Sequence, residues 1–110
     1  MSLSEVFEML NGITGFDGKV AYRAFPVNHA PALPFICYLD TSTDNFFADN
    51  KVYTVIQGID IELYSARKDF TSEGLLEAEL DKHNLTWQKY EEYISDEDMY
   101  EVVYTVTVNQ

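Results

Sequence analysis

The chain has 110 residues, of which 46% are hydrophobic and 15% aromatic, so it is large and apolar enough for one domain with a packed core, and a disordered chain is excluded. Its 19 acidic residues outnumber seven scattered basic ones, and the net charge of −12 excludes the clustered basic surface that binds nucleic acid. No apolar run approaches the ~20 residues that span a bilayer, and a single cysteine without a signal peptide predicts a protein of the reducing cytoplasm.

The first predicted element is a short amphipathic helix. Residues 3–10 carry apolar side chains at helical spacing, and Asn11-Gly12 supplies a stop signal. Ser2 and Glu5 stand at the spacing of a capping box, in which each residue binds the backbone N–H of the other. The helix is therefore expected to begin directly after Ser2.

A strand, a loop and a second strand are expected next. Lys19–Phe25 alternates between polar and apolar residues, and all three prolines then fall within residues 26–34, which predicts a fixed, extended loop. Phe35–Leu39 is predicted to be the second strand. It contains Cys37, which we interpret as a small buried hydrophobic residue, because no second cysteine or nearby histidine offers it a partner.

Residues 40–50 are interpreted as a polar loop, and the run that follows them is too long for an ordinary strand of about 5–6 residues. Apolar groups occupy one side of this run, interrupted only by Gln57, and more polar residues occupy the other. We expect one buried face, one partly wet face, and strand edges that are covered or shared with a neighbouring chain. The first side comprises Tyr53, Val55, Ile59, Ile61 and Leu63, and the second Thr54, Gly58, Asp60 and Glu62.

The best-marked element is a second helix, expected from about Ser72 to His83. At its start Thr71 is the expected N-cap, and Phe70 and Leu75 occupy the two positions of a hydrophobic staple. At its end Asn84 suits the left-handed conformation, and Leu85 can fold back onto Leu80 of the last turn as in a Schellman cap.

The C-terminal part predicts a β-hairpin. Thr86–Tyr93 and Met99–Val108 alternate on either side of a turn at Ser95–Asp98. The whole chain, residues 1–110, is therefore predicted to be a single α+β domain of order α-β-β-β-α-β-β, with two helices covering one face of a mainly antiparallel sheet. One face of the last strand is expected to be lined by Tyr100, Val102, Tyr104, Val106 and Val108.

Residues that carry chemistry are sparse. His29 lies in the proline-containing loop and His83 at a helix end, and neither has a nucleophile or a second ligand at a recognised spacing. Three aspartates recur between residues 40 and 49, but the stretch lacks the glycine and the spacing of an EF-hand, so we interpret them as turn formers. No phosphate-binding glycine loop or nucleophile motif is present. The sequence predicts no catalytic residue, no cofactor, no metal and no enzyme.

Two features are candidates for contacts with a partner. Phe46 and Phe47 are adjacent, so in an extended chain they point to opposite sides. We expect one ring to enter the core, and the other either to be sheltered by the proline loop or to anchor another protein. Residues 91–101 hold six carboxylates and no basic residue, which predicts a solvated hairpin end or a surface that repels DNA or faces a basic partner. The candidate interface residues are Asn45, Phe46, Phe47, Asp49, Asn50, Tyr53, Asp96, Glu97 and Asp98.

Over roughly residues 35–108 the chain resembles a family of small phage and prophage proteins from Gram-positive hosts, and the motifs occur in the right order. The resemblance implies a head–tail joining (neck) or tail-completion role, similar to the tail terminators of long-tailed phages. Those proteins have an α+β fold and close into hexameric rings that cap the tail tube and dock the head. The segments that carry it are Asn45–Tyr53, Ile61–Tyr64, Lys68-Asp69, Glu92–Ile94 and Met99–Val102.

The same resemblance implies the partners and the location of the protein. The partners are other copies of the chain in a ring, tail-tube proteins and head-completion proteins, with no direct contact to nucleic acid or membrane. The location is the host bacterial cytoplasm during assembly and then the head–tail junction of the virion. The family role is structural, so no catalytic residue is implied.

Two alternatives remain open. An acidic interaction module, such as a DNA-mimic inhibitor, would spread carboxylates in an array over helices or a whole face, whereas here they concentrate at one hairpin. A small ligand-binding domain or hydrolase would need a deep pocket with convergent polar groups.

Overall fold

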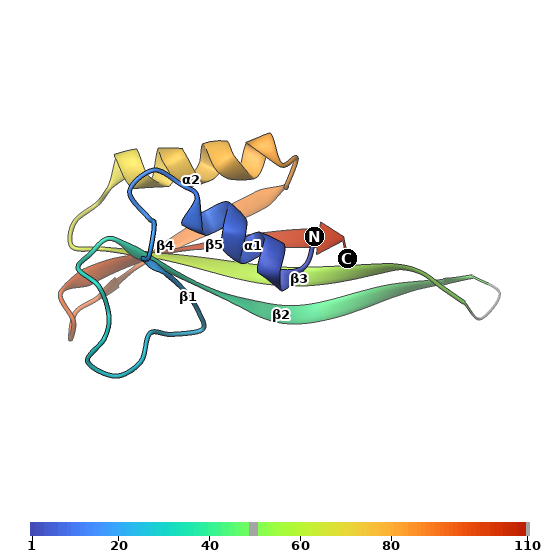
Figure 1. Cartoon of the computed structure of the whole chain (residues 1–110), viewed down its shortest axis with the longest axis horizontal. Helices are drawn as coiled ribbons and strands as arrows, with labels where there is room; N and C mark the ends of the chain where they lie inside the picture. The colour runs from blue at the N-terminus through green and yellow to red at the C-terminus, as the bar shows by residue number, and fades with distance from the viewer. Residues whose placement is uncertain (49–50, 110) are drawn as a thin grey trace.

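The computed structural model describes the backbone of residues 1–48 and 51–109, and the side chains of residues 1–41 and 57–108. Two helices and five strands follow one another in the predicted order α-β-β-β-α-β-β, which confirms an α+β fold (Figure 1). Their bounds are α1 Leu3–Asn11, β1 Val20–Tyr22, β2 Phe35–Ala48, β3 Lys51–Ser65, α2 Phe70–Lys82, β4 Trp87–Ile94 and β5 Met99–Asn109.

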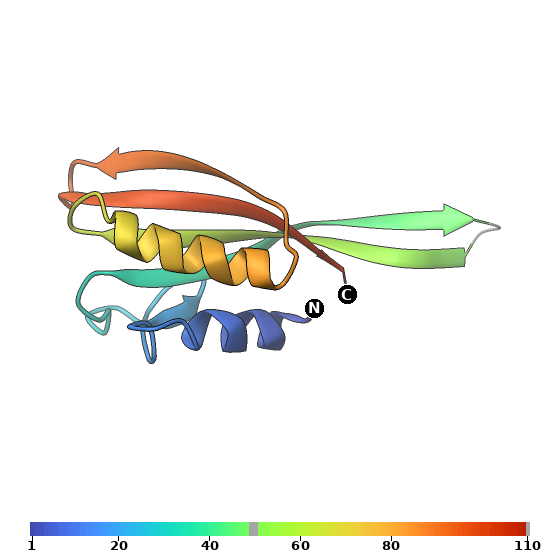
Figure 2. The same cartoon turned by 90° about the horizontal axis from the view of Figure 1, so that it is seen from above.

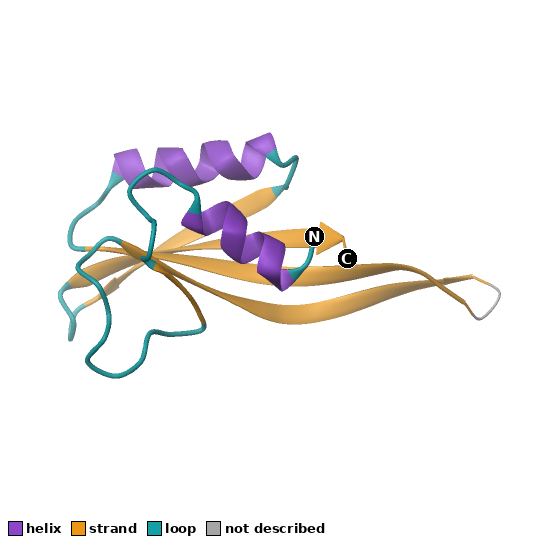
Figure 3. Ribbon diagram, viewed as in Figure 1, coloured by secondary structure: helices purple, strands orange, loops and turns teal. Residues whose placement is uncertain are grey.

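The five strands form one sheet in the order β1-β2-β3-β5-β4. β1 pairs with β2 in parallel, and the other neighbouring strands are antiparallel. Both helices lie on the same face of the sheet, so the molecule has a helical layer and a strand layer (Figure 3). We call this face the helix face and the opposite one the far face.

The core lies between the helices and the helix face. Ile59, Ile61 and Leu63 of β3 are each 1% exposed, as their alternation predicts, and Gln57 is buried in the same row. Each such apolar side chain stabilises the fold by roughly 1.5–3 kcal/mol relative to an exposed one. The helices contribute Val6, Met9, Leu10, Leu76 and Leu80, and β5 contributes Val102, Tyr104, Val106 and Val108.

α1 begins with the predicted capping box. The backbone N–H of Ser2 donates to Glu5 Oε1 at 2.9 Å, and the N–H of Glu5 donates to Ser2 Oγ at 3.2 Å. Two of the N–H groups that a helix start leaves unpaired are thereby satisfied.

α2 begins earlier than predicted, because its N-cap is Asp69 and not Thr71. The N–H of Ser72 donates to Asp69 Oδ1 at 3.0 Å, and the Ser72 hydroxyl donates to Asp69 Oδ2 at 2.7 Å. A carboxylate has two acceptor oxygens and a charge that favours the positive end of the helix dipole, so it caps better than a hydroxyl. The predicted hydrophobic staple is therefore wrong: Phe70 is the first helical residue and is 75% exposed.

The end of α2 confirms the predicted Schellman cap. Asn84 has a φ of 58°, in the left-handed region, and its N–H donates to the Asp81 carbonyl at 3.0 Å. The N–H of Leu85 donates to the Leu80 carbonyl at 3.0 Å, and Leu85 packs against the core.

β1 is shorter than the predicted strand over Lys19–Phe25. Arg23 has a φ of 68°, which turns the chain away from the sheet directly after Tyr22. The Arg23 N–H still donates to the Tyr38 carbonyl at 2.8 Å, and this bond ends the β1–β2 pairing.

The largest correction concerns residues 40–50, which we interpreted as a loop. β2 continues to Ala48, and its last residues pair with the start of β3, with Asn45 opposite Val55 and Ala48 opposite Lys51. Threonine and phenylalanine favour strands, no glycine or proline interrupts residues 40–48, and the pairing with β3 outweighs the local turn preference of Asp and Asn.

Candidate interaction surfaces: a projecting arm and an acidic hairpin

The β2–β3 hairpin extends well beyond the body of the molecule (Figures 1 and 2). The last residue pair between β3 and β5 is Ile56 with Asn109. Past it, in the described part of the chain, residues 45–48 of β2 and 51–55 of β3 pair only with each other. We call these two segments the arm, and neither helix runs alongside it (Figure 2).

The arm presents unpaired backbone groups along both of its outer edges. β1 covers β2 only as far as the pair Tyr22 with Tyr38, so the outer edge of β2 has no partner strand from Leu39 onward among the described residues. Such edges are templates for pairing with another chain, and a two-stranded hairpin by itself is marginally stable in water. The arm is therefore the part of this fold that most needs a neighbouring surface.

Four of the predicted interface residues lie in the arm: Asn45, Phe46, Phe47 and Tyr53. Asp49 and Asn50 lie outside the described residues. The side chains of Phe46 and Phe47 lie outside the described ones, so the expectation that one of the two rings enters the core stays a prediction. The backbone at both positions lies past the end of β5.

The other three, Asp96, Glu97 and Asp98, form the turn between β4 and β5 and are exposed. The turn is closed by the Glu97 N–H, which donates to the Ile94 carbonyl at 3.2 Å, and Tyr93 donates its hydroxyl to Asp98 Oδ1 at 2.6 Å. This turn and the arm lie at opposite ends of the long axis of the molecule (Figures 1 and 2). The structure therefore does not bring the two groups of predicted interface residues together within one chain.

On the helix face, carboxylates are neutralised by bases from elsewhere in the chain. Lys68 Nζ lies 2.7 Å from Glu91 Oε1 and 2.8 Å from Glu73 Oε2. Lys89 Nζ lies 3.1 Å from Glu73 Oε1 and 2.6 Å from Glu77 Oε2. Glu73 is only 3% exposed, and a buried charge requires such partners. Of the six carboxylates of residues 91–101, Glu91 therefore has a compensating base, Lys68.

On the far face two carboxylates meet at one hydroxyl. Tyr64 donates to Glu101 Oε2 at 2.8 Å and lies 3.3 Å from Glu62 Oε1. Burial, and then the neighbouring Glu101 carboxylate, raise the pKa of the Glu62 carboxyl above its usual value. Neither Glu62 nor Glu101 forms an ion pair with a base in the described part of the chain. Sequence reasoning missed this group, because only the β3–β5 register places Tyr64 opposite Glu101.

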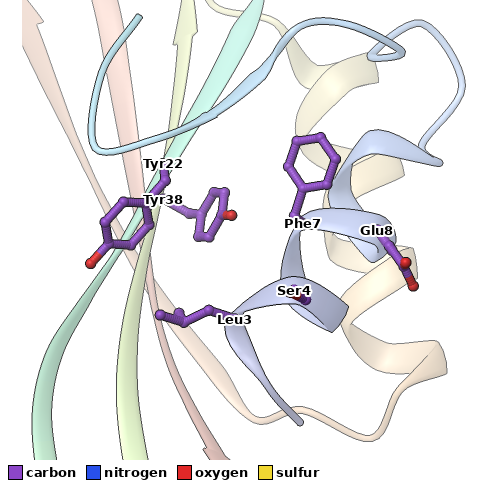
Figure 4. A pocket seen from close by; sticks show the side chains of 6 residues that line it. All are labelled: Leu3, Ser4, Phe7, Glu8, Tyr22 and Tyr38. Carbon is purple, nitrogen blue, oxygen red and sulfur yellow. The ribbon is translucent and has the colours of Figure 1, made fainter.

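The molecule also carries open hollows. The one between α1 and the β1–β2 edge measures about 390 Å³, and Figure 4 shows Leu3 and Phe7 of α1 on one side and Tyr22 and Tyr38 on the other. Its polar groups do not converge, since the Glu8 carboxylate points away from the strands (Figure 4). It therefore lacks the convergent polar groups of a specific small-molecule site.

Among the described residues, no three His, Cys, Asp or Glu side chains are grouped so that they could hold a metal ion. His83 Nε2 lies 3.2 Å from Glu79 Oε1 on the same helix. None of the described helices has the length and apolar character needed to cross a membrane.

Comparison with known proteins adds no relative. Neither a scan against protein-family models nor a search of the curated proteins finds a match for this chain.

Proposed function

We propose that this protein is a non-enzymatic structural protein of the head–tail junction of a phage or prophage, a tail terminator that assembles into a ring. The observation that supports this most is the arm, a bare two-stranded ribbon that extends from a small α+β body. The segment Asn45–Tyr53, which carries the resemblance to phage neck proteins, falls in the arm and its connection. In this proposal the partners are other copies of the chain, tail-tube proteins and head-completion proteins.

The position of the arm suits a ring. Identical subunits close into a ring through a heterologous contact, in which one patch of each copy meets a different patch of the next. The arm and the acidic turn at the other end of the long axis are two such different patches (Figure 1). The net charge of −12 also suits a passage for DNA, because negative walls do not bind phosphate.

Electron microscopy of phage tails tests the proposal. Tails assembled without this protein should fail to join heads, and adding the purified protein should restore joining and place a six-membered ring at the head-proximal end. A matched control adds the protein without the arm, with residues 45–55 replaced by a two-residue turn. Tails that join heads normally in the absence of the protein would contradict the proposal.

The alternative of a DNA mimic is less well supported by the structure. Glu73, Glu77 and Glu91 are engaged by two lysines, so these three carboxylates of the helix face are not open to a partner that binds DNA-like charge. Protection of DNA from a restriction enzyme by the purified protein would nevertheless favour that alternative.

A further inference from the structure

The far face carries a hollow of about 350 Å³, lined by residues at the start of β2, the end of β3 and the β4–β5 turn, away from the arm. β2 and β3 provide its floor, and the segment between β1 and β2 and the β4–β5 turn provide its walls. We call it the far-face hollow. Its main lining residues are Phe25, Phe35, Cys37, Tyr64, Ile94 and Met99.

The far-face hollow is aromatic and uncharged at its base. The rings of Phe25 and Phe35 meet edge to face with centroids 5.2 Å apart, and Phe35 lies 5.2 Å from Tyr64. Burial, with the nearby carboxylates of Glu62 and Glu101, raises the pKa of the Cys37 thiol to about 11, so the thiol is neutral at physiological pH. An apolar or aromatic side chain at the base of the hollow therefore meets no charge.

Negative charge borders the far-face hollow. The Tyr64 hydroxyl connects its lining to Glu101 and Glu62, and Glu97 lines its wall. Arg23, the one base that the described lining contains, has a guanidinium nitrogen 3.4 Å from Asp40 Oδ1. The chemistry that complements this surface is an aromatic group accompanied by a cation.

The arm has that chemistry. It contains Phe46 and Phe47, and Lys51 is its one basic residue. The arm lies at one end of the long axis, and the β4–β5 turn, which lines the far-face hollow, lies at the other (Figure 1). The arm of one molecule can therefore reach the hollow of another. A contact of this kind is head-to-tail and closes into a ring when the rotation between copies allows it.

We propose that the arm of one copy docks in the far-face hollow of the next copy, with one of its two phenylalanines against the aromatic lining and Lys51 beside the carboxylates. This inference rests on the proposed function, because it names the acceptor surface of the ring contact. A second copy is the occupant that the structure favours, since one chain carries both halves of a complementary pair.

Site-specific crosslinking tests the proposal directly. The full chain with p-benzoylphenylalanine at position 47 is irradiated at a salt concentration at which the wild-type protein self-associates, and the crosslinked dimer is mapped by mass spectrometry. We expect crosslinks to residues 23–37 and 94–101 of the second copy. Crosslinks concentrated instead on the outer edge of β4 or on the helices would overturn the proposal.

Charge reversal gives an independent test. Lys51→Glu and Glu101→Lys should each weaken self-association about tenfold, and the two together should restore most of it. Lys82→Glu makes the same change of charge at an exposed site on α2, and it should have a much smaller effect. Glu97→Lys, on the exposed turn, replaces Glu101→Lys if circular dichroism shows that the latter does not fold. The proposal fails if Lys51→Glu weakens association no more than Lys82→Glu does.

These results separate the inference from the proposed function. If the wild-type protein forms rings on tails but neither crosslinks nor charge reversal point to the far-face hollow, the inference fails and the ring stands. If the wild-type protein associates neither in solution nor on tails, the proposed function fails, and the inference fails with it.

Discussion

Tyr64 and Glu101 face each other across β3 and β5, and the tyrosine hydroxyl donates to the carboxylate at 2.8 Å. The same hydroxyl lies 3.3 Å from Glu62, so two carboxylates share one donor. Like charges held this close destabilise the fold when both are ionised. The arrangement leads to a prediction about pH.

Glu62→Gln is expected to raise the melting temperature at pH 7. The pKa of Glu62 is higher in the folded protein than in the unfolded chain, so its ionisation opposes folding above that pKa, and the opposition disappears as the pH falls below the unfolded value. The stabilisation by glutamine should therefore shrink toward acid pH. Thermal melts of the wild-type and Glu62→Gln proteins from pH 7 to pH 3 measure this stabilisation. A difference in melting temperature that grows as the pH falls would contradict a raised pKa of Glu62 in the folded protein.

Asp69→Ala is expected to lower the free energy of unfolding by about 0.5–2 kcal/mol, because it removes the N-cap of α2. Thr71→Ala is the matched control, since Thr71 is exposed and lies inside the helix, and its effect should be much smaller. Urea unfolding followed by circular dichroism compares the two variants. Equal losses would mean that the helix starts at Thr71 after all.

Phe46→Ser and Phe47→Ser are both expected to leave the melting temperature nearly unchanged, because the backbone at these positions lies past the end of β5. At least one of them should abolish the assembly of infectious particles. Calorimetry and a plaque assay on the same variants test this. A loss of about 3–5 kcal/mol, typical of truncating a buried phenylalanine, would show instead that the ring belongs to the core.

Self-association is expected to strengthen as salt rises. Copies with a net charge of −12 repel one another at low salt, and screening shortens to ~3 Å near 1 M, which leaves the apolar contacts unopposed. Light scattering across a salt series should show a monomer or weak association at low salt and larger species at high salt. A dimer of constant stability at every salt concentration would contradict this expectation.

Features encoded by neighbouring residues were predictable from the sequence. The capping box of Ser2 and Glu5 and the Schellman cap at Asn84 depend on residues at most five apart, and both have the predicted form. Even over this short range the choice between two neighbouring cap residues was predicted wrongly. Asp69 is a stronger N-cap than Thr71, so α2 begins earlier than predicted.

Features that depend on strand pairing were not predictable. Residues 40–48 contain turn-forming aspartates and an asparagine, and only the hydrogen bonds offered by β3 make them a strand. The meeting of Glu62, Tyr64 and Glu101 depends on the register of β3 against β5, which no local pattern encodes. The far-face hollow likewise requires the fold of the proline-containing segment beside the β4–β5 turn.

The position of the arm in the sheet determines how it bears mechanical load. Its strands are continuous with β2 and β3, and β3 is the central strand, paired with β5 over ten residue pairs from Ile56 with Asn109 to Ser65 with Tyr100. The hydrogen bonds of such a ladder run perpendicular to the strands. A pull on the arm along its axis therefore shears all of these bonds at once, whereas a peeling force would break them one at a time. In the proposed role, as a joint that holds a DNA-filled head onto a tail, the arm would have to resist tension of the first kind.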